Sequence, residues 1–165
     1  MTTTLLLPYQ LIEKDKLTYQ FITDQEIFYE VYFLDYSYMF LDYPHLANKV
    51  YTLNLDVSGN YMKKVLKDER VGLTVVEVVR LFFKVLENVV IYVCDNLDNR
   101  QLARMRKFDL WFKKYNDGEI VKRDDLAVFD GVEIYNSLLV HRTNKNLDQI
   151  IDAFSELNSR NIGDK

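Results

Sequence analysis

The sequence contains only one cysteine, Cys94, and two histidines, His45 and His141. One cysteine cannot form an internal disulfide, and this set is too small for the usual zinc-binding clusters. The chain has five glycines and no Gly-x-Ser-x-Gly or P-loop pattern, so a nucleophile elbow and a glycine-rich phosphate loop are also missing. We therefore expect no metal and no cofactor. These absences leave open whether the chain is an enzyme, and they favour the answer that it is not.

Long apolar runs and a large excess of one charge are missing as well. The longest apolar candidate, residues 73–94, is interrupted by four charged residues, whereas a membrane-spanning helix needs about 20 consecutive apolar residues. The N-terminus lacks the basic region of a secretory signal. A net charge of −4 gives no overall attraction to nucleic acid or to anionic membranes. We expect a cytoplasmic protein without membrane contact, and nucleic acid is not a favoured partner.

Aromatic residues, in contrast, are abundant. The chain has ten phenylalanines and twelve tyrosines, and eight of the tyrosines lie between residues 19 and 61. Tyrosine suits a half-buried strand, where its ring packs against the core and its hydroxyl reaches water. The simpler interpretation is therefore a sheet with one solvent-exposed face. The alternative is a binding face, for which Tyr32 and Tyr36 are the candidate partner-surface residues.

Alternating apolar residues predict antiparallel strands in the first third of the chain. Residues 17–22 and 27–35 are expected to form a hairpin, with residues 36–43 continuing the second strand past a bulge. Residues 50–57 show the clearest period of two, which is typical of a strand with one buried face. Residues 1–16 are expected to form an N-terminal arm.

The middle of the chain predicts two helices on either side of a buried strand. Residues 74–88 place every charged residue on one helical stripe, and Thr74 with Glu77 matches a capping box. The uninterrupted apolar run at residues 89–94 predicts a strand that is covered on both faces. A second helix is expected to begin after Asp98, its N-cap.

A hairpin around Asp130-Gly131 and a last helix from Asn146 complete the predicted order β-β-β-α-β-α-β-β-α. This order indicates a mixed α+β fold, in which helices pack on a mostly antiparallel sheet. We expect one domain over residues 17–158, followed by a flexible tail at residues 159–165.

The densest polar cluster lies where the predicted buried strand ends. Ligands of open α/β sheets bind at that edge, and a helix N-terminus lowers the pKa of a thiol. The candidate ligand-binding residues there are Cys94, Asp95, Asp98, Arg100 and Arg104. The structural alternative is a small core cysteine, an acidic helix cap and an ion pair, and we favour that alternative. Two carboxylates without a further ligand are a weak metal signal.

The helix that follows is basic, although the protein is acidic. Residues 100–114 contain six basic residues and one acid, Asp109. Such a helix can contact an acidic partner, or it can simply be solvated. Under the first interpretation Lys107 and Trp111 are further candidates for the partner surface. No helix-turn-helix spacing surrounds them, so specific DNA recognition is poorly supported.

The sequence resembles an uncharacterised family of small bacterial proteins, mostly from Bacteroidota, known only as a domain of unknown function. The resemblance extends from Gln20 to Phe154 and implies no activity. The residues that carry it are Tyr29-Glu30-Val31-Tyr32-Phe33, Phe82-Phe83 in the Thr74 helix, Tyr92-x-Cys94-Asp95-x-x-Asp98-x-Arg100-Gln101-x-x-Arg104, Phe108-x-x-Trp111-Phe112 and Ser137-Leu138-Leu139-Val140-His141.

The element order is also similar to the GNAT acetyltransferase fold without its first strand and first two helices. Asn99-x-x-x-Ala103 is similar to that family's Asn-x-x-Ala segment, with one residue too many. The family's pyrophosphate loop, Arg/Gln-x-x-Gly-x-Gly/Ala, maps loosely onto residues 69–74, where Glu69 and Thr74 depart from the pattern. This resemblance implies a degenerate GNAT-like fold, with acetyl-CoA expected as a ligand only in that case.

Three functions are therefore ranked. The first is a non-enzymatic binding or protein-interaction module, whose partner is another protein or a second copy of the chain. The second is an acyl-CoA-dependent transferase or acyl-CoA binder. The third is a metal-dependent enzyme at Asp95 and Asp98.

Overall fold

The computed structural model describes residues 4–59, 66–94 and 101–160. In chain order its elements are β1 Ile12–Asp15, β2 Thr18–Ile22, β3 Phe28–Asp35, the 3-10 helix η1 Ser37–Phe40, β4 Val50–Ser58, α1 Glu69–Phe82, β5 Val89–Cys94, α2 Gln101–Tyr115, β6 Ile120–Phe129, β7 Val132–His141 and α3 Leu147–Arg160. The mixed α+β class and the predicted order are confirmed, with one strand and one 3-10 helix added.

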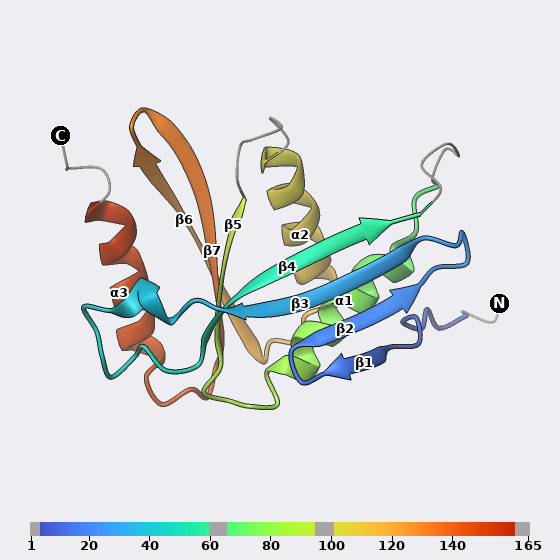
Figure 1. Cartoon of the computed structure of the whole chain (residues 1–165), viewed down its shortest axis with the longest axis horizontal. Coiled ribbons are helices and arrows are strands. Elements are labelled where there is room, and N and C mark those ends of the chain that lie inside the picture. The colour runs from blue at the N-terminus through green and yellow to red at the C-terminus, as the bar shows by residue number, and fades with distance from the viewer. Residues whose placement is uncertain (1–3, 60–65, 95–100, 161–165) are drawn as a thin grey trace.

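The seven described strands form one sheet in the order β1-β2-β3-β4-β5-β7-β6 (Figure 1). Neighbouring strands are antiparallel except for β4 and β5, which are parallel. These two share only the pairs Val50 with Val89 and Tyr51 with Val90, and beyond them they diverge (Figure 1). The sheet therefore has two halves that meet at one short parallel contact.

Helices cover both faces of this sheet (Figure 1). α1 and α2 pack on one face, where the Phe33 ring of β3 stacks on the Phe82 ring of α1 with centroids 3.7 Å apart. α3 and η1 pack on the other face, where Phe40, Ile91 and Phe154 belong to a second apolar core. Apolar burial on both faces is the main favourable contribution to folding.

Strand β5 runs between the two cores. Tyr92 and Cys94 belong to the core under α1 and α2, whereas Val89 and Ile91 belong to the core under α3. Apart from Val93, which is 39% exposed, the side chains on both faces of the strand are buried, and this explains why the strand lacks alternating polar residues. The predicted buried strand is confirmed with its predicted bounds.

Helix α1 begins five residues before the predicted start at residue 74, and it ends at Phe82, six residues before the predicted end at residue 88. The N-cap is Asp68, whose Oδ1 accepts a hydrogen bond of 2.9 Å from the Arg70 backbone N–H. The Thr74 hydroxyl is instead used inside the helix: its Oγ1 donates to the Arg70 carbonyl and accepts the Tyr9 backbone N–H at 2.8 Å. The N-terminal segment therefore holds the first turns of α1 in a way that no local pattern reveals.

Other boundaries differ from prediction as well. Residues 12–15, expected within an arm, form the edge strand β1. Residues 37–40, expected to extend a strand, form η1, and Phe40 is fully buried there. α3 continues to Arg160, two residues into the predicted tail, and the expected cap Asp98 lies outside the described residues.

Helices α1 and α2 touch at a glycine. A Cβ placed on Gly72 would lie 2.3 Å from Cδ1 of Trp111, so the indole of α2 lies directly on the first turns of α1. Only glycine leaves room for the ring at this position. The close approach fixes how near the two helices lie to each other.

A buried lysine connects α2 to β6. The Lys122 side chain is only 7% exposed, and its ammonium contacts Asp109 of α2 at 3.4 Å and also contacts Asp124. Asp124 in turn accepts a hydrogen bond of 2.6 Å from the Ser137 hydroxyl. Hydrogen bonding by Lys113 and the charge of Lys122 hold the pKa of the Asp109 carboxyl below its ordinary value.

Among the described residues, no helix is both long enough and apolar enough to cross a membrane.

We expect Gly72→Ala to lower the free energy of unfolding. Alanine favours a helix over glycine by about 1 kcal/mol, but the new methyl group meets the Trp111 ring, and overpacking costs about 1–3 kcal/mol. The net loss, up to about 2 kcal/mol, is measured by urea denaturation followed by circular dichroism. Adding Trp111→Leu to this variant is expected to restore part of the loss. A Gly72→Ala variant more stable than the native chain would contradict the contact.

We expect Asp109→Asn to destabilise the protein most at neutral pH, by about 1–3 kcal/mol, because Lys122 loses a charged partner. The folded-state pKa of Asp109 is lowered, so its contribution is present above the unfolded pKa and is lost as the pH falls through the folded pKa. The difference from the native chain should therefore shrink between about pH 5 and pH 2. Urea denaturation across that range measures it, with the exposed Asp152→Asn as control. A difference independent of pH would contradict the assignment.

Candidate functional site

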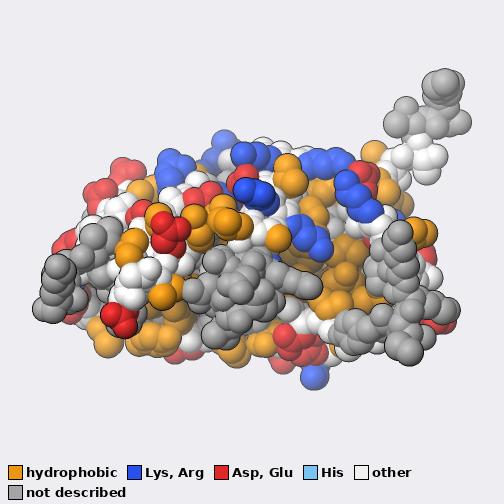
Figure 2. Space-filling model, turned by 90° about the horizontal axis from the view of Figure 1, so that it is seen from above, with side chains coloured by type: hydrophobic (Ala, Val, Ile, Leu, Met, Phe, Trp, Pro, Cys, Tyr) orange, Lys and Arg blue, Asp and Glu red, His pale blue; other side chains and the backbone are white. Residues whose placement is uncertain are grey.

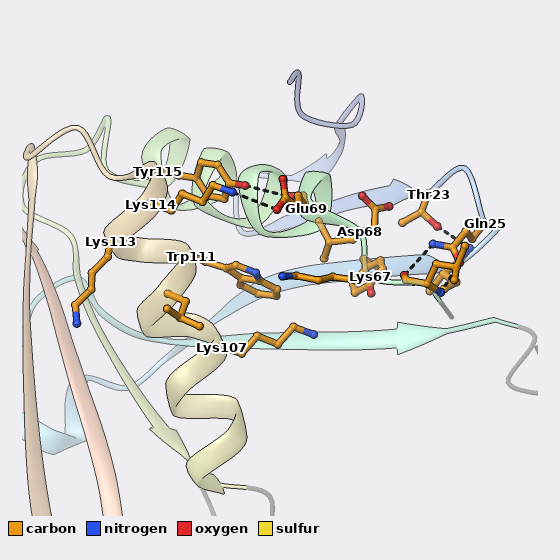
Figure 3. Close-up of a pocket in the computed structure, with 15 residues that line it drawn as sticks. Thr23, Gln25, Lys67, Asp68, Glu69, Lys107, Trp111, Lys113, Lys114 and Tyr115 are labelled. Atoms are coloured by element: carbon orange, nitrogen blue, oxygen red, sulfur yellow. Dashed lines mark hydrogen bonds and ion pairs between the residues drawn. The ribbon is translucent and has the colours of Figure 1, made fainter. Parts of the chain in front are cut away.

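A pocket of about 740 Å³ lies between the start of α1, the turn that joins β2 to β3, and the C-terminal half of α2. This volume is within the range of sites that bind small molecules or anchoring side chains. Seen from above, the molecule has an apolar hollow with lysine and arginine side chains along its border (Figure 2). The pocket lies on the face of the sheet that carries α1 and α2 (Figure 3).

The wall beside the β2–β3 turn is held by local hydrogen bonds. The Ile27 backbone N–H donates to the Thr23 hydroxyl at 3.1 Å, and Glu26 adopts a positive φ of 60° that lets the chain reverse. The Gln25 side chain then bonds across the pocket edge, donating to the Leu66 carbonyl at 3.1 Å and accepting the Leu66 N–H at 2.9 Å. The turn and the segment before α1 therefore form one continuous wall.

The inner surface of the pocket is apolar. Ile27, Tyr29 and Val71 line it and are buried, and Leu66 and Leu110 stand at its edge. Both edge leucines are largely exposed to solvent, with exposed fractions of 69% for Leu66 and 66% for Leu110. Large apolar side chains exposed next to an apolar hollow are typical of a contact surface.

Lysines surround this apolar surface. Lys107 lies with its Nζ 5.0 Å from the centroid of the Trp111 ring, a cation–π distance. Lys67 extends from the α1 side toward the same ring (Figure 3). Lys114 is paired with Glu69 at 3.4 Å, and in the close-up Lys113 points away from the pocket (Figure 3).

Two polar groups at the α1 end of the pocket are already partnered or kept neutral. Asp68 accepts the Arg70 N–H and also the Tyr9 hydroxyl at 2.6 Å. Burial, and next the charge of Asp68, raise the pKa of Tyr29 above its ordinary value, so its hydroxyl stays protonated at neutral pH. The pocket thus offers a neutral hydroxyl and ammonium groups rather than a general base.

A family model named DUF6169, a family of unknown function, matches residues 67–156, more than half of the chain. The chain belongs to this family. The matched segment includes α1, β5, α2, β6, β7 and most of α3. It therefore supplies the helical walls of the pocket, whereas the β2–β3 turn lies outside it. Neither the curated proteins nor the solved structures contain a match to the chain.

Within the DUF6169 segment, the site expected at the end of β5 is only partly described. Cys94 ends the strand as predicted and is buried in the core under α2, with an exposed fraction of 6%. Asp95, Asp98 and Arg100 lie outside the described residues. Arg104 is exposed on α2 and does not line the pocket. Among the residues that can be described, no group of three His, Cys, Asp or Glu side chains could hold a metal ion.

The four partner-surface candidates fall into two places. Lys107 and Trp111 line the pocket. Tyr32 lies half-buried on the opposite face of β3, where burial and then Asp56 raise its pKa. Tyr36 follows β3 and packs edge-on against Tyr38, and burial raises its pKa to about 12. These tyrosines do not form one surface with the pocket.

Sequence reasoning missed the wall formed by residues 66–69. The stretch before α1 is charged and has no periodicity, and Asp68 lacks the acidic or amide partner three residues later that marks a capping box. An aspartate preceding a long apolar helix is still a possible N-cap, and that is the one signal that points to it. The β2–β3 turn contributes through tertiary contact and carries no such signal.

The buried position of Cys94 predicts slow reaction with thiol reagents in the folded protein. Because its side chain is 6% exposed and the chain has no other cysteine, modification reports this residue alone. We expect the rate measured with a chromogenic disulfide to rise at least about a hundredfold in urea, where the thiolate becomes accessible. Equal rates in native buffer and in urea would show instead an accessible, reactive thiol at the end of β5.

Proposed function

We propose that the protein is a non-enzymatic interaction module, which binds a partner protein through the pocket between α1 and α2. The observation that carries this proposal is the combination of an apolar hollow with a wide, exposed apolar edge at Leu66 and Leu110. A small ligand would be enclosed by the hollow alone, whereas a protein surface also covers the edge. The pocket then receives an anchoring side chain of the partner.

The chemistry of the lining residues supports binding rather than catalysis. The carboxylate of Asp68 is used as a helix cap and by Tyr9, and Glu69 is paired with Lys114. General acid–base catalysis needs a group with a pKa near the working pH that can reach the reacting atom. No histidine or cysteine lines the pocket in the described part of the chain.

A second candidate, an acyl-CoA binder, is favoured by one observation. Parallel strands β4 and β5 meet at only two residue pairs and then diverge, and α1 begins on the same side of the molecule as the opening (Figure 1). This arrangement agrees with the GNAT-like topology expected from the sequence. The N-terminus of a helix can bind phosphate through its backbone N–H groups.

The start of α1 is nevertheless poorly suited to a pyrophosphate. The Arg70 backbone N–H already donates a hydrogen bond to Asp68. Glu69 adds a second negative charge in the first turn, and this charge repels a phosphate. Gly72, the glycine in the loosely matching loop, is covered by the Trp111 ring. The Arg70 side chain is also turned away, because it donates to the Leu7 carbonyl at 2.9 Å and to Asp24 at 3.1 Å.

Selection of displayed peptides tests the proposal. A library of random peptides is selected on the native protein and on Leu110→Arg, which places a bulky cation at the exposed edge of the pocket. We expect a set of sequences enriched on the native chain and lost on Leu110→Arg. Leu41→Arg is the matched control, since Leu41 is 72% exposed and lies after η1 on the opposite face, and it should retain the whole set.

Two results would overturn the proposal. One is enrichment of the same sequences on native protein and on Leu110→Arg. The other is a melting temperature that rises with acetyl-CoA concentration in the native chain and not in Leu110→Arg, which would favour the second candidate, because a ligand stabilises the state that it binds.

A further inference from the structure

We infer that the partner presents an acidic segment to this pocket, with an apolar side chain against Trp111 and Leu110 and a neighbouring carboxylate between the ammonium groups of Lys67 and Lys107. This inference rests on the proposed function, and it adds the chemistry by which the partner is recognised.

Two lysines extend into one space, and neither is paired with an acid of the described residues. The Lys67 and Lys107 side chains approach the Trp111 ring from opposite walls of the pocket (Figure 3). Neither makes an ion pair with any residue in the described ranges, whereas Lys113 is paired with Asp109 and Lys114 with Glu69. Two like charges that share a partly apolar space repel each other, and a bound anion removes that repulsion.

The acids nearest to these lysines are engaged elsewhere. Asp68 uses Oδ1 for the Arg70 backbone N–H and Oδ2 for the Tyr9 hydroxyl. Glu69 is 3.4 Å from Lys114. Both carboxylates keep their negative charge, but four lysines and only these two acids line the pocket. The lining is therefore positively charged on balance, and a carboxylate of a protein partner would complement it.

The pocket offers a third donor. Tyr29 lines the inner wall, and its hydroxyl makes no hydrogen bond to any residue that the structure describes. Burial raises its pKa, so the group remains an O–H donor at neutral pH. A hydrogen bond from a neutral hydroxyl to a carboxylate is charge-assisted and stronger than one between neutral groups.

An apolar side chain beside the carboxylate explains the remaining surface. Leu110 and Leu66 are largely exposed at the edge, and Trp111 presents its ring to the hollow. Burying such groups against an aromatic or branched side chain is favourable, because it removes apolar surface from water. A free carboxylate without an apolar neighbour would leave these groups in water.

Trp111 provides a direct readout, because it is the only tryptophan in the chain. The probes are short peptides in which one phenylalanine is flanked by aspartate and glutamate, and matched peptides in which asparagine and glutamine replace the acids. Binding is followed by the change in tryptophan fluorescence of the full chain. We expect the acidic peptides to bind at least about tenfold more tightly than the amide peptides, and their affinity to fall as the salt concentration rises.

Paired variants test the two lysines. Lys67→Ala with Lys107→Ala is expected to weaken the acidic peptides by about tenfold or more and to leave the amide peptides nearly unchanged. Lys16→Ala with Lys84→Ala removes the same charge from exposed positions outside the pocket, and should leave both affinities unchanged. Urea denaturation of both double variants verifies that each is folded.

The possible outcomes distinguish failure of the acidic segment from failure of the interaction pocket. Equal binding of acidic and amide peptides, abolished by Leu110→Arg, would overturn the acidic segment and leave the interaction pocket standing. Binding of decanoate but of no peptide would overturn both, because the pocket would then be a site for a small organic acid. No fluorescence change with any probe, together with no peptides selected from the random library, would also overturn both.

Discussion

The packing of Trp111 on Gly72 sets the spacing between α1 and α2, and the rest of the site depends on that spacing. The indole lies where a Cβ would be, so the two helices approach as closely as a bare backbone permits. The same ring lines the pocket on its other side and carries Lys107 at a cation–π distance. One aromatic residue therefore joins the core to the surface, because its packing against the glycine fixes the position of the ring in the pocket without a flexible loop.

The short contact between β4 and β5 leaves space for helices to pack on both faces of the sheet. Only two residue pairs join the halves of the sheet, and helices on both faces supply the packing that the missing strand pairs do not. β5 is the strand that can carry this arrangement, because its side chains are apolar on both faces. In addition, the ion pair of Lys122 with Asp109 connects α2 to β6 on the far side of β5. α2 is thus held from two directions, by α1 and by the closing hairpin.

The sequence predicts the fold far better than it predicts the site, for a physical reason. Strand 50–58 is visible in its period of two, and strand 89–94 in its uninterrupted apolar run. The predicted buried face of strand 50–58 is nevertheless not the buried one throughout, because Val50 is fully buried whereas Leu55 and Val57 are exposed. The start of α1 is not visible in this way, because its N-cap Asp68 is held in place by Tyr9, which lies 59 residues away. The capping-box pattern at Thr74 pointed to the wrong residue because its hydroxyl serves the same distant segment. The pocket walls come from three such separated segments, so Lys107 and Trp111 could be anticipated from a basic aromatic helix whereas Leu66 and Lys67 could not.

A lysine-rich pocket is compatible with a chain whose net charge is −4. Screening limits the reach of exposed charges to roughly 8 Å at physiological salt, so a partner close to the pocket responds to the groups around it rather than to the total. Four lysines and two acids line this pocket, and Lys67 and Lys107 make no ion pair with a residue of the described ranges. In the binding mode that we propose, the carboxylate and its apolar neighbour act together, since neither charge alone nor burial alone would offset the cost of association.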